Sequence, residues 1–183
     1  MINKDGDNTG SLKEVRTSNI LPVDLNALMY MNYMAVSEFY SLLGDSAKSD
    51  DFIKKASEIK EAIEAVLWMN EDKMWYDYDL ENDKPRKYFY PSNLFPLWAE
   101  CYDIGRKDEL AQSAVGYLRK TGAIRCKGGV PTSLDESGQQ WDFPNAWPPL
   151  QHILVAGNLI FISRQRFYFS SHLDSPFFSA MFK

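Results

Sequence analysis

The 183-residue chain is poor in cysteine and has no surplus of positive charge. Its two cysteines, Cys101 and Cys126, are too few for a disulfide-rich scaffold and have no neighbouring histidines for a zinc site. Lysine and arginine together number 20 against 25 acidic residues, which gives a net charge of −5. This balance argues against a nucleic-acid-binding protein, because such proteins attract phosphate with surplus positive charge.

The chain also lacks a long apolar run. The longest one, Ile153–Ile162, is interrupted by Gly157 and Asn158. A membrane-spanning helix needs about 18 or more apolar residues, so we expect no such segment in this chain. The first seven residues are polar and lack the apolar stretch of a secretory signal, so none is expected there. The sequence leaves the localisation open.

What is present is the composition of a folded protein of about one average domain in length. The chain is 45% hydrophobic, 25% charged and 14% aromatic, and it includes five tryptophans and ten tyrosines. Disorder of the whole chain is excluded by this content of apolar residues. The aromatic residues suit either a packed core or the recognition of sugars and peptides.

The composition changes near Gly157. Six of the eleven phenylalanines lie in the last 26 residues, which contain no glutamate, tryptophan or glycine. Residues 158–169 show no helical period and are rich in β-prone apolar residues, a pattern typical of segments that aggregate when exposed. We therefore predict a helical region over residues 1–157 and a divergent Phe-rich tail over residues 158–183.

Apolar spacing and helix-end signals predict five helices. The first begins at Pro22 with Asp24 as its cap and ends at Gly44. It is apolar on nearly all sides, which is typical of a helix buried in a larger helical assembly. The second begins at Ser49 or Asp50 and has the clearest amphipathic pattern of the chain, carried by Phe52, Ala56, Ile59, Ile63, Val66 and Leu67.

The remaining helices are predicted from Ser92 to Tyr102, over residues 107–120, and from Trp147 onward. A short strand or hairpin arm is expected at Met74–Tyr78, with Asp77 and Asp79 taken by default as solvated. The repeated order of helix, short turn, helix and long loop predicts an all-α fold of helix pairs. Such pairs stack as a solenoid or form an α/α toroid, and this number of pairs leaves a toroid incomplete.

Residues 138–149 are the most distinctive segment for chemistry. They place two tryptophans, a carboxylate and several amides on a proline-containing loop that leads into a helix. Indole faces pack on the C–H groups of sugar rings, and carboxylate and amide groups bind hydroxyls. The candidate substrate-binding residues are Gln140, Trp141, Asp142, Asn145 and Trp147. Asp142 is open to a site-lining, a structural or a catalytic role, and the tryptophans are open to sugar contact or packing.

Five segments together resemble a known enzyme family. They are PVDLNA at residues 22–27, WYDYD at 75–79, YPSNLFPLW at 90–98, GVPTSL at 129–134 and QWDFPNAWPP at 140–149. In order and spacing they resemble the α,α-trehalases of glycoside hydrolase family 37, with QWDFPNAWPP as a family signature. Over residues 1–157 the resemblance implies part of an (α/α)₆ toroid that hydrolyses trehalose to two glucoses with inversion, with no metal and no cofactor. The resemblance does not extend to the Phe-rich tail at residues 158–183.

The same resemblance implies that the catalytic pair lies outside this chain. Inversion needs a general acid and a general base held roughly 6.5–9.5 Å apart. In the family the acid is the Asp of a GWDFSSRW segment and the base is a Glu beside a GGGGEY segment. Neither segment occurs in the 183 residues. We therefore expect no catalytic residue in this chain and no activity of the chain alone.

Two other functions remain open at this point. One is a non-catalytic sugar-binding protein or dominant-negative partner of the longer enzyme. The other is a helical-repeat scaffold unrelated to sugars. An incomplete toroid leaves inner helices uncovered, so we also expect self-association through exposed apolar surface. Animal members of the family are secreted or membrane-anchored.

Overall fold

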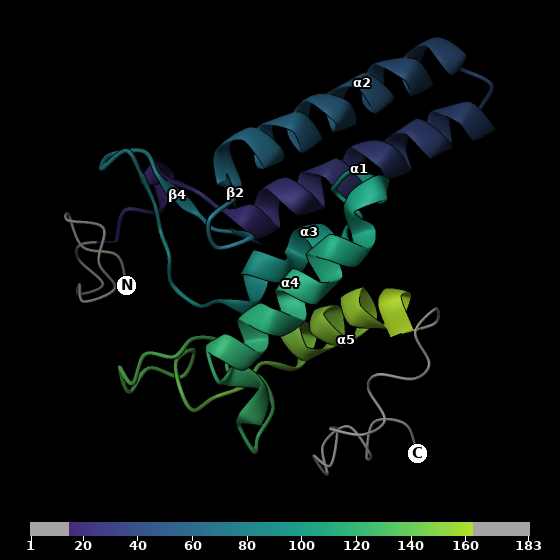
Figure 1. The fold of residues 1–183 in the computed structure, drawn as a ribbon. Coiled ribbons are helices and arrows are strands. Elements are labelled where there is room, and N and C mark those ends of the chain that lie inside the picture. The colour runs from purple at the N-terminus through teal and green to yellow at the C-terminus, as the bar shows by residue number, and fades with distance from the viewer. Residues whose placement is uncertain (1–14, 163–183) are drawn as a thin grey trace. The chain divides into compact units, whose positions relative to one another are not determined.

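The computed structural model describes residues 15–162, and the side chains of residues 15–157. These residues form two compact units that divide between Tyr88 and Phe89. Helices make up most of both units (Figure 1). Among the described residues, no helix combines the length and the apolar character needed to cross a membrane.

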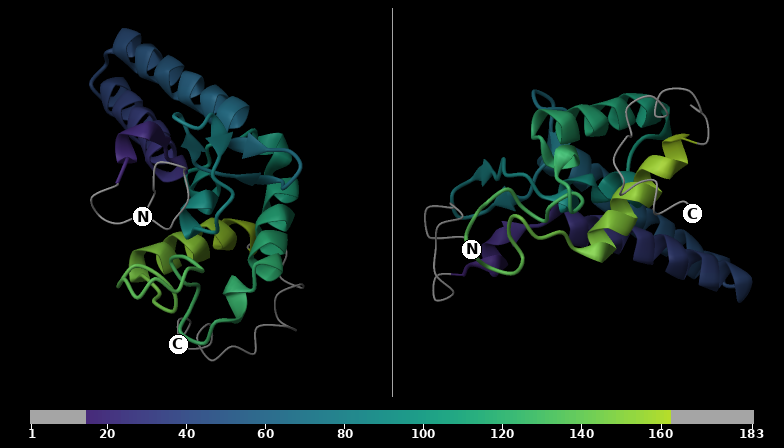
Figure 2. Two further views of the ribbon diagram at one scale, coloured as in Figure 1. Left: turned by 90° about the vertical axis from the view of Figure 1, so that its left-hand side faces the viewer. Right: turned by 90° about the horizontal axis from the view of Figure 1, so that it is seen from below.

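The first unit is built on two helices that lie side by side, α1 (Val23–Leu42) and α2 (Ser46–Ala62) (Figures 1 and 2). Where they pack, the hydroxyls of Ser37 and Ser49 form a buried hydrogen bond of 3.0 Å. Burial of these two polar groups is therefore compensated within the helix pair. The turn between the helices uses Gly44 at a φ of +78°, a conformation that suits glycine at a helix end.

The caps of both helices differ from the sequence prediction. Asp24 accepts a hydrogen bond from the N–H of the adjacent Leu25, and the N–H of Val23 at the start of α1 is bonded by Asp77 instead. The cap of α2 is Asp45, whose carboxylate accepts the N–H of Lys48 at 3.1 Å. The predicted start of α2 at Ser49 or Asp50 was therefore wrong, because Asp45 follows the turn directly and reaches the free N–H groups first.

Short strands follow α2. The helix continues through a π-helical turn (Ile63–Leu67) into the first strand. The strands form two antiparallel sheets: β2 (Trp68–Met69) with β3 (Met74–Trp75), and β4 (Tyr78–Asp79) between β1 (Ile20–Leu21) and β5 (Lys84–Pro85). A 3₁₀ turn at Thr17–Asn19 precedes β1. The predicted single arm at Met74–Tyr78 is thus divided between two sheets.

The second unit contains three α-helices, α3 (Phe95–Trp98), α4 (Lys107–Lys120) and α5 (Pro148–Ile162), with 3₁₀ turns at Pro91–Leu94, Ile104–Arg106 and Ala123–Arg125. Gly157 brings α5 close to α3, because a Cβ at this position would lie 3.4 Å from the backbone nitrogen of Trp98. The buried apolar side chains of this unit include Leu94, Leu97, Leu110, Ala114, Leu118 and Leu154.

Both ends of the third helix differ from the prediction: α3 begins at Phe95, after the 3₁₀ turn at Pro91–Leu94, rather than at Ser92. The third helix ends at Trp98 rather than Tyr102, and Glu100 at a φ of +53° turns the chain out of helical geometry. The predicted range 107–120 is confirmed for α4. The backbone of α5 continues to Ile162, five residues beyond Gly157, and residues 163–183 lie outside the described part. The boundary predicted at Gly157 stays a prediction.

Candidate functional site

The five candidate substrate-binding residues lie on the loop that joins α4 to α5 (Figure 2). Gln151 in the first turns of α5 anchors the early part of this loop. Its side-chain amide donates to the carbonyl of Val130 at 2.7 Å and accepts the N–H of Val130 at 3.0 Å. Gly129 allows this contact, since a Cβ there would lie 3.0 Å from the Gln151 oxygen and its φ is +110°. The loop is thereby tied to the helix that follows it.

The next part of the loop folds back on itself. The N–H of Thr132 donates to the carbonyl of Asn145 at 3.1 Å, and the N–H of Phe143 donates to the carbonyl of Asp135 at 3.0 Å. These backbone bonds join the two ends of the segment 132–145. This segment and the two residues that follow it, residues 132–147, are here called the signature loop, which therefore has a defined conformation with few regular elements.

Trp141 and Trp147 meet edge to face at the end of the signature loop. Their ring centroids are 4.4 Å apart and their planes are inclined by 63°. The two side chains are 46% and 42% exposed, so a large part of each indole is open to a ligand. Gln140 and Asn145 are exposed as well. Four of the five candidate residues therefore present side chains at the surface of one loop.

Asp142 differs from the other four candidates because its carboxylate points into the loop. It is partly buried, and one oxygen accepts the hydroxyl of Ser133 at 2.6 Å while the other accepts the hydroxyl of Ser137. Neither serine was among the residues predicted from the sequence, and Gln151 was not either. Serine and glutamine at these separations form no periodic pattern, so the sequence held no signal for these contacts.

Asp77 lies within the first unit and was expected to be solvated. Instead its side chain is only 14% exposed, accepts the N–H of Val23 at 2.9 Å and lies 3.5 Å from the guanidinium of Arg86. Burial raises the pKa of this carboxyl, and the Val23 N–H and the Arg86 charge oppose that rise. The expectation was wrong because the link between β3 and β4 brings Asp77 to the start of α1.

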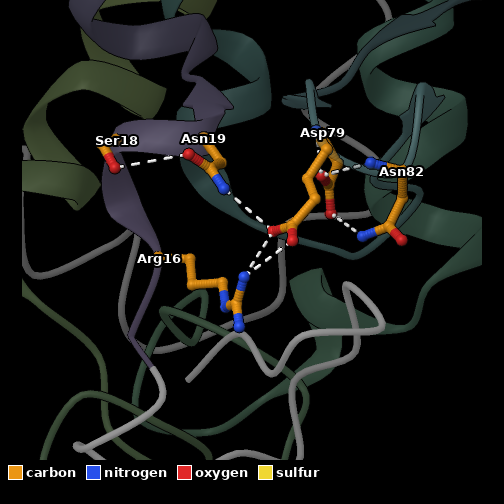
Figure 3. A network of polar contacts seen from close by, with 6 residues as sticks. Arg16, Ser18, Asn19, Asp79 and Asn82 are labelled. Carbon is orange, nitrogen blue, oxygen red and sulfur yellow. Dashed lines mark hydrogen bonds and ion pairs between the residues drawn. The ribbon is translucent and has the colours of Figure 1, made fainter.

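Asp79 is also buried, against the same expectation. Figure 3 shows its hydrogen bonds to Asn82. One oxygen accepts the N–H groups of Glu81 and Asn82 at 3.0 Å, and the other accepts the Asn82 side-chain amide at 2.9 Å. Burial raises the pKa of Asp79, but these hydrogen bonds outweigh it and leave the pKa below its ordinary value. The turn directs Glu81 toward Arg16 and Asn19, which bind its carboxylate. Both aspartates are thus occupied in holding the strands.

Residues 15–162 contain no cluster of side chains suited to binding a metal ion. No group of three or more histidine, cysteine, aspartate or glutamate side chains in this range could hold a metal ion. The chemistry that the described residues offer is therefore that of an aromatic and amide surface on the signature loop, with the carboxylate of Asp142 beneath it.

Comparison with known proteins gives consistent sequence matches. A family model described as Trehalase matches residues 1–181. The trehalase of Apis mellifera is 45% identical over 151 residues, which cover 82% of this chain and 24% of that protein. The trehalase of Homo sapiens is 44% identical over 153 residues, 83% of this chain and 26% of that protein. The chain thus spans about a quarter of the length of these curated relatives.

Solved structures of a trehalase and of another glycoside hydrolase have a similar fold. Neutral trehalase Nth1 from Saccharomyces cerevisiae matches with a TM-score of 0.66 at 21% identity, over 84% of this chain and 30% of that one. A GH63 mannosylglycerate hydrolase from Thermus thermophilus matches with a TM-score of 0.63 at 18% identity, over 80% of this chain and 36% of that one. These likenesses confirm the predicted fold class, part of an (α/α)₆ toroid that is incomplete in this chain. From the family model and these relatives, the chain belongs to the trehalase family.

Proposed function

We propose that this chain is part of an α,α-trehalase, a glycosidase that hydrolyses trehalose to two glucoses with inversion. The observation that carries the proposal is the half-exposed pair of Trp141 and Trp147 on the signature loop of a trehalase-family chain. Indole faces pack on the C–H groups of a sugar ring, and the amides of Gln140 and Asn145 are suited to its hydroxyls. The signature loop then supplies part of the sugar-binding surface.

The chain's share of the reaction is sugar binding rather than proton transfer. Inverting hydrolysis needs an acid and a base on opposite faces of the glycosidic bond. The segments that carry these groups in the family, GWDFSSRW and GGGGEY, do not occur in the 183 residues. Acid–base hydrolysis of this kind needs no cofactor. We therefore expect the isolated chain to hold trehalose without cleaving it.

The binding part of the proposal is tested by calorimetric titration of the purified chain with trehalose. Trp141→Ala and Trp147→Ala should each weaken binding by roughly tenfold, because each removes a large exposed ring from the binding surface. Ile104→Ala is the matched control, since Ile104 is an exposed apolar side chain outside the loop. Absence of heat at millimolar trehalose, or equal losses in all three variants, would count against the proposal.

The catalytic part is tested by assaying glucose release from trehalose. The isolated chain should release no more glucose than a blank without protein. Release of glucose that Asp142→Asn abolishes would show that the chain carries its own catalytic carboxyl group and that this part of the proposal is wrong. Binding without turnover, combined with inhibition of an active trehalase by the added chain, would favour the alternative of a sugar-binding or dominant-negative partner.

A further inference from the structure

The signature loop is closed around one carboxylate. Both backbone groups of Asp142 are bonded inside the loop: its N–H donates to the carbonyl of Gln139 at 3.1 Å, and its carbonyl accepts the N–H of Asn145 at 2.9 Å. Its two side-chain oxygens bind hydroxyls from Ser133 and Ser137, nine and five residues earlier. Asp142 thus joins both arms of the loop.

The two serine contacts have a defined direction. A carboxylate only accepts hydrogen bonds, so each hydroxyl hydrogen points to Asp142. Each serine oxygen in turn accepts a backbone N–H two residues further on, from Asp135 at 3.3 Å and from Gln139 at 3.2 Å. Two relays therefore run from backbone N–H through a serine hydroxyl to the carboxylate. Hydrogen bonds to a charged acceptor are stronger than neutral ones, which makes these relays effective restraints.

The residues that flank this carboxylate present the exposed aromatic surface. Trp141 directly precedes Asp142 in the chain, and Trp147 lies just after Asn145, which is bonded to the Asp142 carbonyl. The two indoles can stay in edge-to-face contact only while the backbone at residue 141 and the backbone at residue 147 both keep their positions. The carboxylate that holds them is itself partly buried and already accepts two hydroxyls.

From this arrangement we propose that Asp142 is a positioning residue: through Ser133 and Ser137 it holds the signature loop in the conformation in which Trp141 and Trp147 meet. The part of the proposal that concerns sugar rests on the proposed function, since the Trp pair is taken there as the sugar-binding surface. In this role Asp142 does not touch the sugar. It affects sugar binding because it sets the fraction of molecules in which Trp141 and Trp147 are in contact.

Circular dichroism of the full 183-residue chain measures that fraction directly. Two inclined indoles in contact couple their strong ultraviolet transitions and give a paired positive and negative band. Trp68 and Trp75 also lie edge to face, at 4.6 Å, and contribute a second such signal. The signal of the Trp141–Trp147 pair is obtained by subtracting the spectrum of Trp141→Phe. The remaining Trp68–Trp75 signal reports that the rest of the fold is intact.

The expected result links two measurements. Asp142→Ala or Ser137→Ala should lower the ratio of paired to unpaired molecules roughly tenfold, the effect of losing a hydrogen bond to a charged group, and the amplitude of the paired band should fall with the paired fraction. Because apparent affinity falls in proportion to the population of the binding-competent state, trehalose affinity should fall by the same factor as the band. Ser137→Thr keeps the hydroxyl and should keep both signals. Glu136→Ala is the control, since it removes a different carboxylate of the same loop, one that is exposed.

The outcomes separate this inference from the proposed function. A paired band that is unchanged in Asp142→Ala and Ser137→Ala overturns the inference. So does a loss of trehalose affinity without loss of the band, which would mean that Asp142 contacts the sugar directly. If the band depends on Asp142 and Ser137 but the unaltered chain binds no trehalose, the positioning role stands and the proposed function fails. Ser137 is exposed, so its variants keep the test available if Asp142→Ala does not fold.

Discussion

Asp77 takes the capping role that the sequence suggested for Asp24. Its carboxylate reaches the first N–H of α1 from a position 54 residues later in the chain, and it lies beside the buried Arg86. Capping signals are ordinarily sought within a few residues of the helix start. A cap supplied from a remote link between two strands is invisible to such a search, although Asp77 itself was noted as part of the WYDYD segment.

The contribution of Asp77 to stability can be measured by substitution. We expect Asp77→Ala to lower the free energy of unfolding by about 3 kcal/mol, because it removes one partner of a buried ion pair together with a helix cap. Asp24→Ala is the control and should lower that free energy by less than about 1 kcal/mol, the value of a carboxylate in a first helical turn. Urea unfolding followed by the helical signal measures both, and equal losses would show that Asp77 has no special role.

The raised pKa of Asp77 predicts the sign of a pH effect. Because its pKa lies above the ordinary value of 3.8, the folded protein keeps this proton at pH values where the unfolded chain has lost it. The stability gained in this way is fully present below the unfolded pKa and is lost as the pH rises through the folded pKa. The unaltered chain should therefore gain stability relative to Asp77→Asn as the pH falls from about 7 to about 4. A relative loss on acidification would mean that Arg86 holds the carboxylate ionised.

At the scale of elements, helix ranges followed from the sequence more reliably than helix ends. The range of α4 was predicted over its full length, because apolar spacing reports the helical period along the whole element. The range of α1, which is apolar on nearly all sides, was placed to within two residues at either end from the signals of Pro22 and Gly44. The start of α2 and the end of α3 were wrong, since each depends on one or two residues at a turn. The two-residue strands could not be assigned to their two sheets from the sequence, because two residues are too few to show the alternating pattern of a strand.

The turn between α1 and α2 offers a paired test of backbone conformation. Gly44 has a φ of +78°, and no atom lies within 4 Å of the place where a Cβ would stand, so Gly44→Ala should cost about 1 kcal/mol from conformation alone. Gly116 lies inside α4 and is also open, so Gly116→Ala should instead add about 0.5–1 kcal/mol. Thermal unfolding of the two variants should shift in opposite directions. A gain in stability for Gly44→Ala would contradict the left-handed conformation.

At the scale of the whole molecule, the exposed apolar side chains of α1 stand out. This helix was expected to be buried in a larger assembly, yet its exposed residues include Leu25, Leu28, Met34, Phe39 and Leu42. The chain spans about a quarter of the length of its curated relatives. Apolar surface of this kind favours association in water.

We therefore expect the 183-residue chain to self-associate through this face of α1. Replacing Phe39 and Leu42, which are 60% and 79% exposed, by lysine should shift the chain toward monomer in sedimentation velocity experiments. Ser41→Lys is the matched control, because it adds charge on the same exposed turn without removing apolar surface. If Ser41→Lys dissociates the chain equally well, charge rather than the apolar face controls association. A chain that is monomeric without any substitution would contradict the expectation.

The family, the helical character and the loop that carries the candidate site are all predictable from the amino-acid sequence. These follow from patterns repeated over neighbouring residues and from motifs kept in order, both of which can be read along the chain. Only the tertiary structure decided that Asp77 caps α1, that Gln151 anchors the loop at Val130, and that Asp142 binds two serines. The physical reason is that a helix hydrogen-bonds residues four apart, whereas these contacts join residues up to 54 apart, which only packing brings together.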